Sequence, residues 1–163
     1  MDTFEYRLSN EQYKREIISL LMDNKLPVSD LNSSKTQFII SIENDNVIGC
    51  IGIEPYEKDG LLRSLAVHPD YRNLGIGTQL LQRLLAYCRQ LGIENVHLLT
   101  TTAEKYFLSK GFLNANRDEA PESIKKTLEF STICPSTSAY MILKKISSRS
   151  FPFYEEFNIP PSR

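Results

Sequence analysis

The sequence predicts an α/β protein with a mixed central sheet of about six to seven strands and helices on both faces. Short segments rich in β-branched and apolar residues alternate with segments whose apolar residues recur at helical spacing. Their order is strand, helix and a meander of strands, then strand, helix, strand, helix and strand. This order is typical of a single sheet that is covered on both sides.

Turn residues divide these segments. Asn44-Asp45-Asn46 is predicted to be a hairpin turn because Asn and Asp tolerate left-handed backbone, and residues 55–60 are predicted to form a second turn. Strands are expected at residues 3–8, 37–43, 47–54, 61–67, 95–101, 112–115 and 139–145. Helices are expected at 10–24, capped by Ser9 or Asn10, and at 76–91, 103–110 and 121–128.

Composition excludes several classes of function. The 163 residues suit one domain, and a net charge of −1 gives no broad basic surface for nucleic acid. No apolar run approaches a membrane span, and the polar start is no signal peptide. Cys50, Cys88 and Cys134 are too far apart for a zinc motif, so no metal site is predicted. An odd cysteine count without a signal indicates reduced thiols and a cytoplasmic protein.

The stretch from Leu61 to Leu85 is predicted to hold an anion. An apolar strand ends at Pro69, which lacks the N–H that a sheet needs, and a helix begins near Ile76. The turn Arg72-Asn73-Leu74-Gly75-Ile76-Gly77-Thr78 brings unpaired N–H groups to the positive end of that helix. Arg72 adds a cation that suits phosphate oxygens. The alternative is that the glycines only allow a tight connection.

This stretch also resembles a known family. The run LAVHPDYRNLGIG with its following helix resembles the acyl-CoA signature of the GNAT N-acetyltransferases, and AEKYFLSKGF resembles that family's helix beside the pantetheine arm. The resemblance implies a GNAT fold and an N-acetyltransferase domain at residues 1–146, followed by an aromatic and proline-rich tail at 147–163. That tail either covers its own sheet edge or docks on a second subunit, which leaves a homodimer open.

A narrower resemblance concerns the second half of the chain. RSLAV, LLTTTAEKYF and RDEAPESIKKTLEFSTICPSTSAYM resemble the bacterial arsenic-resistance N-acetyltransferases. These are related to enzymes that acetylate the amine of arsinothricin- or phosphinothricin-type antibiotics. The resemblance therefore implies a small, acidic, amino-acid-like acceptor. Cys134 is expected to be an inert buried thiol, because arsenic would need several thiolates and none is adjacent.

The resemblance implies acetyl-CoA as cosubstrate. Leu65, Ala66 and Val67 would hold the pantetheine arm through their backbone, with the Leu65 N–H as the donor to the thioester oxygen. Many relatives have a tyrosine acid where this chain has Phe107, and Tyr106, about 100° away around the helix, is expected to face elsewhere. The implied coenzyme-binding residues are Leu65, Ala66, Val67, Arg72, Asn73, Leu74, Gly75, Ile76, Gly77, Thr78, Ala103 and Phe107.

Several residues are candidates for binding and activating the acceptor. Glu54 and Glu129 are candidate bases. The alternative is that both are solvated or paired surface carboxylates and that a water chain to bulk solvent accepts the proton. Arg63 interrupts an apolar strand, so it should have an anionic partner, either a protein carboxylate or the substrate. Arg117 is a second candidate, or forms an ion pair with Glu129. Short hydroxyls near the expected cleft are Ser64, Thr101, Thr102 and Ser131.

Three functions remain open on the sequence alone. The first is an acetyl-CoA-dependent N-acetyltransferase that modifies the primary amine of a small acidic molecule. The second is a transferase whose acceptor is a protein or another amine, although a polyamine site should be lined with carboxylates. The third is a non-catalytic acyl-CoA sensor, supported by Phe107 and by the absence of an obvious base. His68 is expected in a turn, and His97 is expected to point out of the core.

Overall fold

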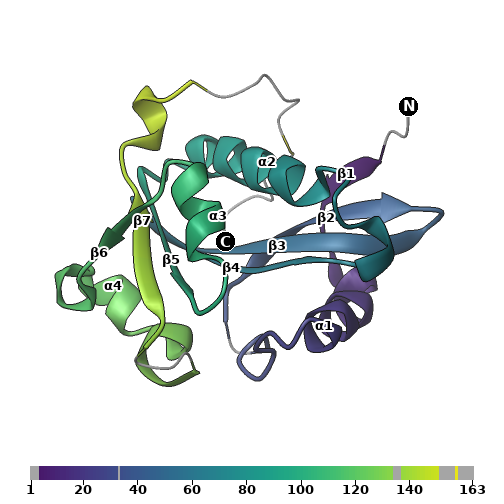
Figure 1. Ribbon diagram of the computed structural model, residues 1–163, viewed down its shortest axis with the longest axis horizontal. Helices are drawn as coiled ribbons and strands as arrows, with labels where there is room; N and C mark the ends of the chain where they lie inside the picture. The colour runs from purple at the N-terminus through teal and green to yellow at the C-terminus, as the bar shows by residue number, and fades with distance from the viewer. Residues whose placement is uncertain (1–3, 33, 134–136, 151–156, 158–163) are drawn as a thin grey trace.

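The computed structural model describes residues 4–32, 34–133, 137–150 and 157, and within them it contains a seven-stranded mixed sheet (Figure 1). Its order is β1-β2-β3-β4-β5-β7-β6. The strands are β1 (Glu5–Leu8), β2 (Gln37–Glu43), β3 (Asn46–Tyr56), β4 (Asp59–Val67), β5 (Asn95–Thr100), β6 (Leu113–Ala115) and β7 (Ala139–Leu143). The predicted fold class is confirmed, because the sheet is mixed and has helices on both faces.

The strands pair as two antiparallel groups joined by one parallel pair. Strands β1 to β4 form an antiparallel meander, and β5, β7 and β6 form the second antiparallel group. Strands β4 and β5 are parallel, which requires a crossover between them. Helix α2 provides that crossover.

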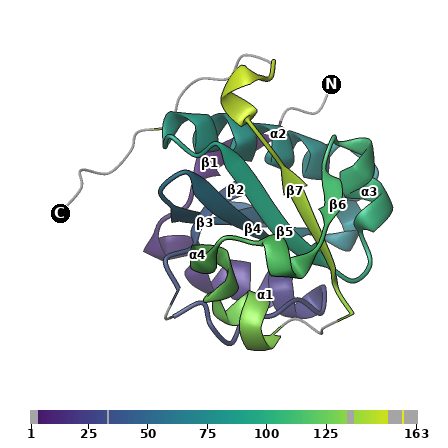
Figure 2. The same ribbon diagram turned by 90° about the vertical axis from the view of Figure 1, so that its left-hand side faces the viewer.

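The helices divide the core between the two faces of the sheet. The helices are α1 (Lys14–Asp23), α2 (Ile76–Gln90), α3 (Glu104–Ser109) and α4 (Glu122–Lys125). Figures 1 and 2 show α2 and α3 on one face and α1 and α4 on the other. Alternation along each strand explains this division: Ile39 and Ile51 pack with α2, whereas Ile40 and Cys50 pack with α1.

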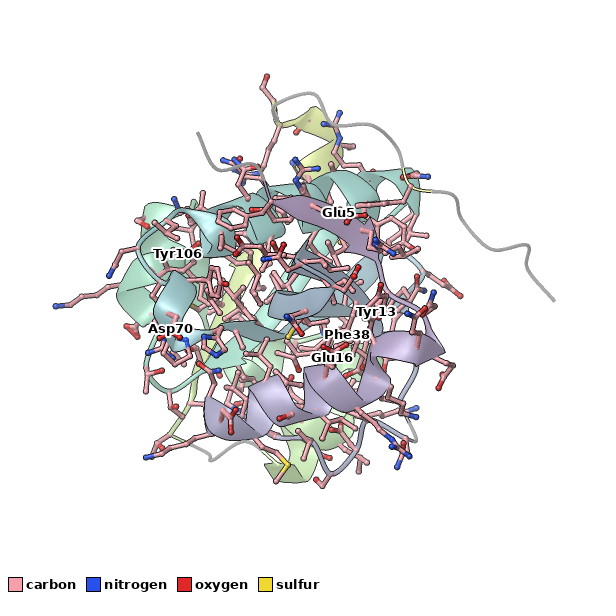
Figure 3. All side chains as sticks on the ribbon, turned by 90° about the vertical axis from the view of Figure 1, so that its right-hand side faces the viewer. Glu5, Tyr13, Glu16, Phe38, Asp70 and Tyr106 are labelled. Atoms are coloured by element: carbon pink, nitrogen blue, oxygen red, sulfur yellow. The ribbon has the colours of Figure 1, made fainter. Side chains whose placement is uncertain are left out.

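The first helical segment begins where the sequence indicates. Asn10 accepts a hydrogen bond from the Gln12 N–H and caps a 3₁₀ turn at Glu11–Tyr13, which leads into α1. Figure 3 shows α1, which carries Glu16 and follows Tyr13, running along the sheet beside Phe38. None of the helices in the described part of the chain combines the length and the hydropathy that a membrane span needs.

The structure corrects two local expectations. The turn predicted at residues 55–60 is shorter, because Pro55 and Gly60 pair within β3 and β4. Pro55 is tolerated there because the pairing of β3 with β2 ends at Ile53, so no ladder bond is lost. His97 does not point out of the core. Its side chain is buried, with Nδ1 2.7 Å from the Tyr140 hydroxyl and Nε2 2.8 Å from Asp59 Oδ1.

Candidate active site

Strands β4 and β5 separate part of the way along the sheet. They pair only where Asp59–Leu61 lie beside Asn95–His97, although β4 continues to Val67 and β5 to Thr100. Beyond Leu61, no strand among the described residues pairs with the β5 side of β4, so backbone groups there are available to a ligand. Two cavities lie along this part of β4.

A bulge in β4 marks the point where these cavities meet. Ser64 and Leu65 together lie opposite Ile51 of β3, because the register shifts between Cys50 and Gly52. Ser64 has a φ of +61°, in the left-handed region, and its carbonyl lies 3.3 Å from Cys50 Sγ. The carbonyl and the next N–H of a trans peptide point in opposite directions. The Leu65 N–H is therefore directed away from Cys50.

The first cavity, the cradle cavity, has a volume of about 490 Å³ and lies over the start of α2. It is lined by Asn24, Leu65, Ala66, Val67, Tyr71, Arg72, Asn73, Gly75, Ile76, Gly77, Thr78 and Tyr106. Helix α2 begins at Ile76, so its first N–H groups lie at this cavity, where the sequence predicts an anion site. Leu74 was also expected here, but its side chain is 55% exposed and it does not line the cavity.

Different structural requirements favour glycine at the two positions of this turn, Gly75 and Gly77. Gly75 has a φ of +82° and caps α2, so its backbone conformation favours glycine. Gly77 is helical, and a Cβ added there would meet nothing closer than Val67 Cγ2 at 3.8 Å. Packing within the described residues therefore does not require glycine at position 77. The free space above its backbone fits a ligand that approaches closely.

Arg72 and Tyr106 complete the rim of the cradle cavity. Arg72 Nη2 donates to Asn24 Oδ1 at 2.7 Å, so the end of α1 helps to hold the guanidinium in place. The hydroxyl oxygen of Tyr106 lies 3.1 Å from Thr78 Oγ1, within hydrogen-bond distance. Figure 3 places Tyr106 and Asp70 on the same side of the molecule. Sequence reasoning did not single out Asn24, which lies far from the glycine turn in the chain, and it set Tyr106 aside because its helix position differs from that of Phe107.

The second cavity, the Arg63 cavity, has a volume of about 380 Å³ and lies between β4, β5 and the loop after α1. It brings together most of the residues predicted to bind or activate the acceptor, namely Arg63, Ser64, Thr101, Thr102 and Glu129, and it includes Leu65, the predicted donor to the thioester oxygen. Ala103 and Phe107, which were expected beside the coenzyme, also line it. The remaining lining residues are Lys25, Leu26, Pro27, Leu62, Leu99, Thr100 and Ser138.

Arg63 is the centre of a buried ionic network. Its side chain has no exposed surface, its Nη1 contacts both Asp30 Oδ2 and Glu54 Oε2, and its Nη2 donates to Asp30 Oδ1 at 2.8 Å. Nε donates to Ser64 Oγ at 3.1 Å. The sequence left open whether the anionic partner of Arg63 is a protein carboxylate or the substrate. The described structure shows that protein carboxylates pair with it.

The charges around Arg63 keep it ionised despite its burial. Burial alone would lower the pKa of Arg63, but the Asp30 hydrogen bonds, the charge of Glu129 and the Glu54 hydrogen bond together raise it. Glu54 also accepts from the Tyr56 hydroxyl at 2.7 Å, so both of its oxygens are bonded to protein groups. Glu54 does not line the Arg63 cavity, whereas Glu129 does. This placement favours Glu129 over Glu54 as a base.

Two predicted acceptor residues lie outside the wall of this cavity. Arg117 donates to the Phe130 carbonyl at 2.8 Å, and its guanidinium lies 4.8 Å from the Phe130 ring centroid. Ser131 donates to the Thr127 carbonyl at 2.9 Å. Both side chains thus fasten the turn that carries Glu129. Cys134 lies outside the described residues.

Ser138 is a cavity residue that the sequence did not reveal. Its side chain is buried, and within the part of the chain described here its hydroxyl has no hydrogen-bond partner. Because Ser138 lines the Arg63 cavity, that hydroxyl is available to a bound molecule. A larger cavity of about 610 Å³ between α1 and β2 contains none of these residues.

The family model and the curated relatives that match this chain are all acetyltransferases. The model of the acetyltransferase (GNAT) family matches residues 4–112. Amino-acid acetyltransferases from Ralstonia nicotianae and Proteus mirabilis are 39% and 43% identical over 88 residues each. Each match covers 52% of this chain but only 20% of the relative, so the chain spans about a fifth of the length of these curated relatives.

Solved structures share the fold. N-acetylglutamate synthase from Neisseria gonorrhoeae, complexed with coenzyme A and N-acetyl-glutamate, has a TM-score of 0.75 at 22% identity, covering 89% of this chain and 36% of that one. A GNAT-family acetyltransferase from Staphylococcus aureus Mu50 has a TM-score of 0.70 at 23% identity, covering 87% and 99%. At these identities the likeness concerns the fold alone.

Proposed function

The chain belongs to the acetyltransferase (GNAT) family, and from this premise we propose that it transfers the acetyl group of acetyl-CoA to the primary amine of an amino-acid-like acceptor. The cradle cavity suits the coenzyme pyrophosphate, since it combines the N-terminus of α2, the rim cation Arg72 and the open backbone at Gly77. The Arg63 cavity suits a small acceptor.

One observation carries this proposal. Leu65 lines both cavities, and its N–H is directed away from β3 by the bulge. A thioester whose coenzyme lies in the cradle cavity would therefore present its carbonyl beside Leu65, within reach of a molecule in the Arg63 cavity. A backbone N–H at that point stabilises the oxyanion that forms during acyl transfer.

The chemistry needs few further groups. The amine nitrogen bonds to the acetyl carbon, the carbon–sulfur bond breaks, and coenzyme A leaves as a thiolate that takes up a proton. Phe107 cannot supply that proton, but a thiol ionises near pH ~8.5 and leaves readily. The ammonium group of the acceptor must lose a proton before its nitrogen can attack, and we assign Glu129 to that step because this residue lines the Arg63 cavity.

We further propose that the acceptor is acidic. Lys25 is an exposed cation of the described cavity wall, Arg63 lies buried in the same wall, and Ser138 adds a hydroxyl. Together they suit a carboxylate, phosphinate or arsinate. The amino-acid acetyltransferases named above support an amino-acid acceptor. The arsinothricin type rests on the sequence resemblance alone.

A thiol-release assay tests the function. We expect the purified chain to release coenzyme A from acetyl-CoA in the presence of glutamate, phosphinothricin or arsinothricin, and not with spermidine or a peptide amine. Tight acetyl-CoA binding without thiol release across this panel would instead indicate a sensor. Turnover restricted to spermidine or peptides would contradict the acidic acceptor.

Two substitutions test the assigned residues. Lys25→Ala should raise KM for the acidic acceptor about tenfold with little change in kcat, since a lost ion pair weakens binding by ~1.4 kcal/mol. Lys126→Ala, which removes an exposed cation just after α4 and outside the cavity, is the matched control. Glu129→Gln should lower kcat by about a hundredfold or more. Full activity of Glu129→Gln would show that Glu129 is not the base and would favour a water chain as the proton acceptor.

A further inference from the structure

The thiol of Cys50 is a buried group for which acetyl transfer itself has no use. Cys50 lies in β3 with no exposed surface, opposite Ala66 of β4. Burial raises the pKa of the thiol to about 12, against the opposing effect of a backbone hydrogen bond from Ala66. The thiol therefore keeps its proton near neutral pH. Through this proton the thiol donates a hydrogen bond to the Ser64 carbonyl oxygen, which lies 3.3 Å from Sγ.

The carbonyl that accepts this proton belongs to the peptide that presents the Leu65 N–H. A peptide unit is planar and rigid, so fixing the carbonyl of Ser64 also fixes the direction of the N–H of Leu65. Ser64 needs such a restraint, because its φ of +61° is uncommon for a residue other than glycine, asparagine or aspartate. From the other flank, Arg63 Nε bonds the Ser64 hydroxyl at 3.1 Å.

We propose that Cys50 is a positioning residue for acetyl transfer, because its S–H holds the Ser64 carbonyl and thereby directs the Leu65 N–H at the thioester oxygen. This inference rests on the proposed function. Removing a whole oxyanion donor lowers kcat by about 10²–10³-fold. Loss of the thiol leaves the donor in place but less well aimed, so a decrease of about tenfold is expected.

Steady-state kinetics distinguish positioning from simple packing. Cys50→Ala should lower kcat about tenfold with both KM values nearly unchanged, and Cys50→Ser, which keeps a donor, should recover most of that loss. Cys88→Ala is the matched control, since Cys88 is equally buried but lies on α2. It should leave kcat unchanged. Equal kcat values for Cys50→Ala and Cys88→Ala would overturn the inference while leaving the proposed function intact.

An infrared measurement tests the same contact without turnover. The S–H stretching band lost in Cys50→Ala should lie at lower frequency than the band lost in Cys88→Ala, because the Cys50 thiol donates a hydrogen bond. Adding acetyl-CoA to the full chain without an acceptor should shift the Cys50 band further, since a bond from the Leu65 N–H polarises the shared peptide. A band that stays in place at saturating acetyl-CoA would overturn the inference, even if the chain proved to be a sensor.

Discussion

Gly77→Ala is expected to stabilise the protein and to weaken coenzyme binding, two effects that oppose each other in one variant. The added Cβ fits the described structure, with its nearest neighbours Val67 Cγ2 at 3.8 Å and Tyr106 Oη at 4.0 Å. Glycine within a helix is less stable than alanine by about 0.5–1 kcal/mol. For a chain of this size, the midpoint temperature of thermal unfolding should therefore rise by about 1–4 °C.

The same Cβ occupies the space that we assign to the pyrophosphate. A hydrogen bond to a charged group contributes about 1.5–3 kcal/mol, so displacing one phosphate oxygen from the backbone should weaken coenzyme A binding about ten- to 150-fold. Gly77→Val, with a branched side chain, should abolish detectable binding. Titration calorimetry with coenzyme A measures both variants, and thermal unfolding confirms that they are folded. Unchanged affinity in either variant would refute the cradle at the start of α2.

Three further outcomes follow from the described contacts. Tyr106→Phe removes the hydroxyl that bonds Thr78 and should raise KM for acetyl-CoA severalfold, while kcat and thermal stability change little; an unchanged KM would separate Tyr106 from the coenzyme. Arg63→Ala leaves two buried carboxylates without their cation and should lower the free energy of unfolding in urea by about 3–5 kcal/mol, so a smaller loss would contradict a tight network. Burial lowers the pKa of His97 although Asp59 opposes this, so the unfolded chain binds its proton more readily. Stability should therefore fall as pH decreases below about 6.5, and His97→Gln should reduce this dependence in urea titrations at successive pH values.

The central strand, the glycine turn and the long helix could be predicted because local physics determines them. Apolar periodicity fixes α2, and Gly75 must adopt a positive φ at its cap. The position of the Tyr106 hydroxyl could not be predicted from local sequence. Its position on α3 correctly separates it from Phe107, but only packing of α3 beside α2 brings its hydroxyl to Thr78. The domain boundary after residue 146 and the role of the tail stay predictions.

By itself the sequence determined the family pattern, the order of strands and helices, and the glycine turn before α2, since each depends on residues that are close together in the chain. Only the tertiary structure decided the partners of Arg63. Asp30 and Glu54 lie 33 and nine positions away from it in sequence, and a buried cation selects whichever carboxylates the fold brings near. The bulge was equally hidden, because it arises from the register of β3 against β4 rather than from the residues of β4 alone.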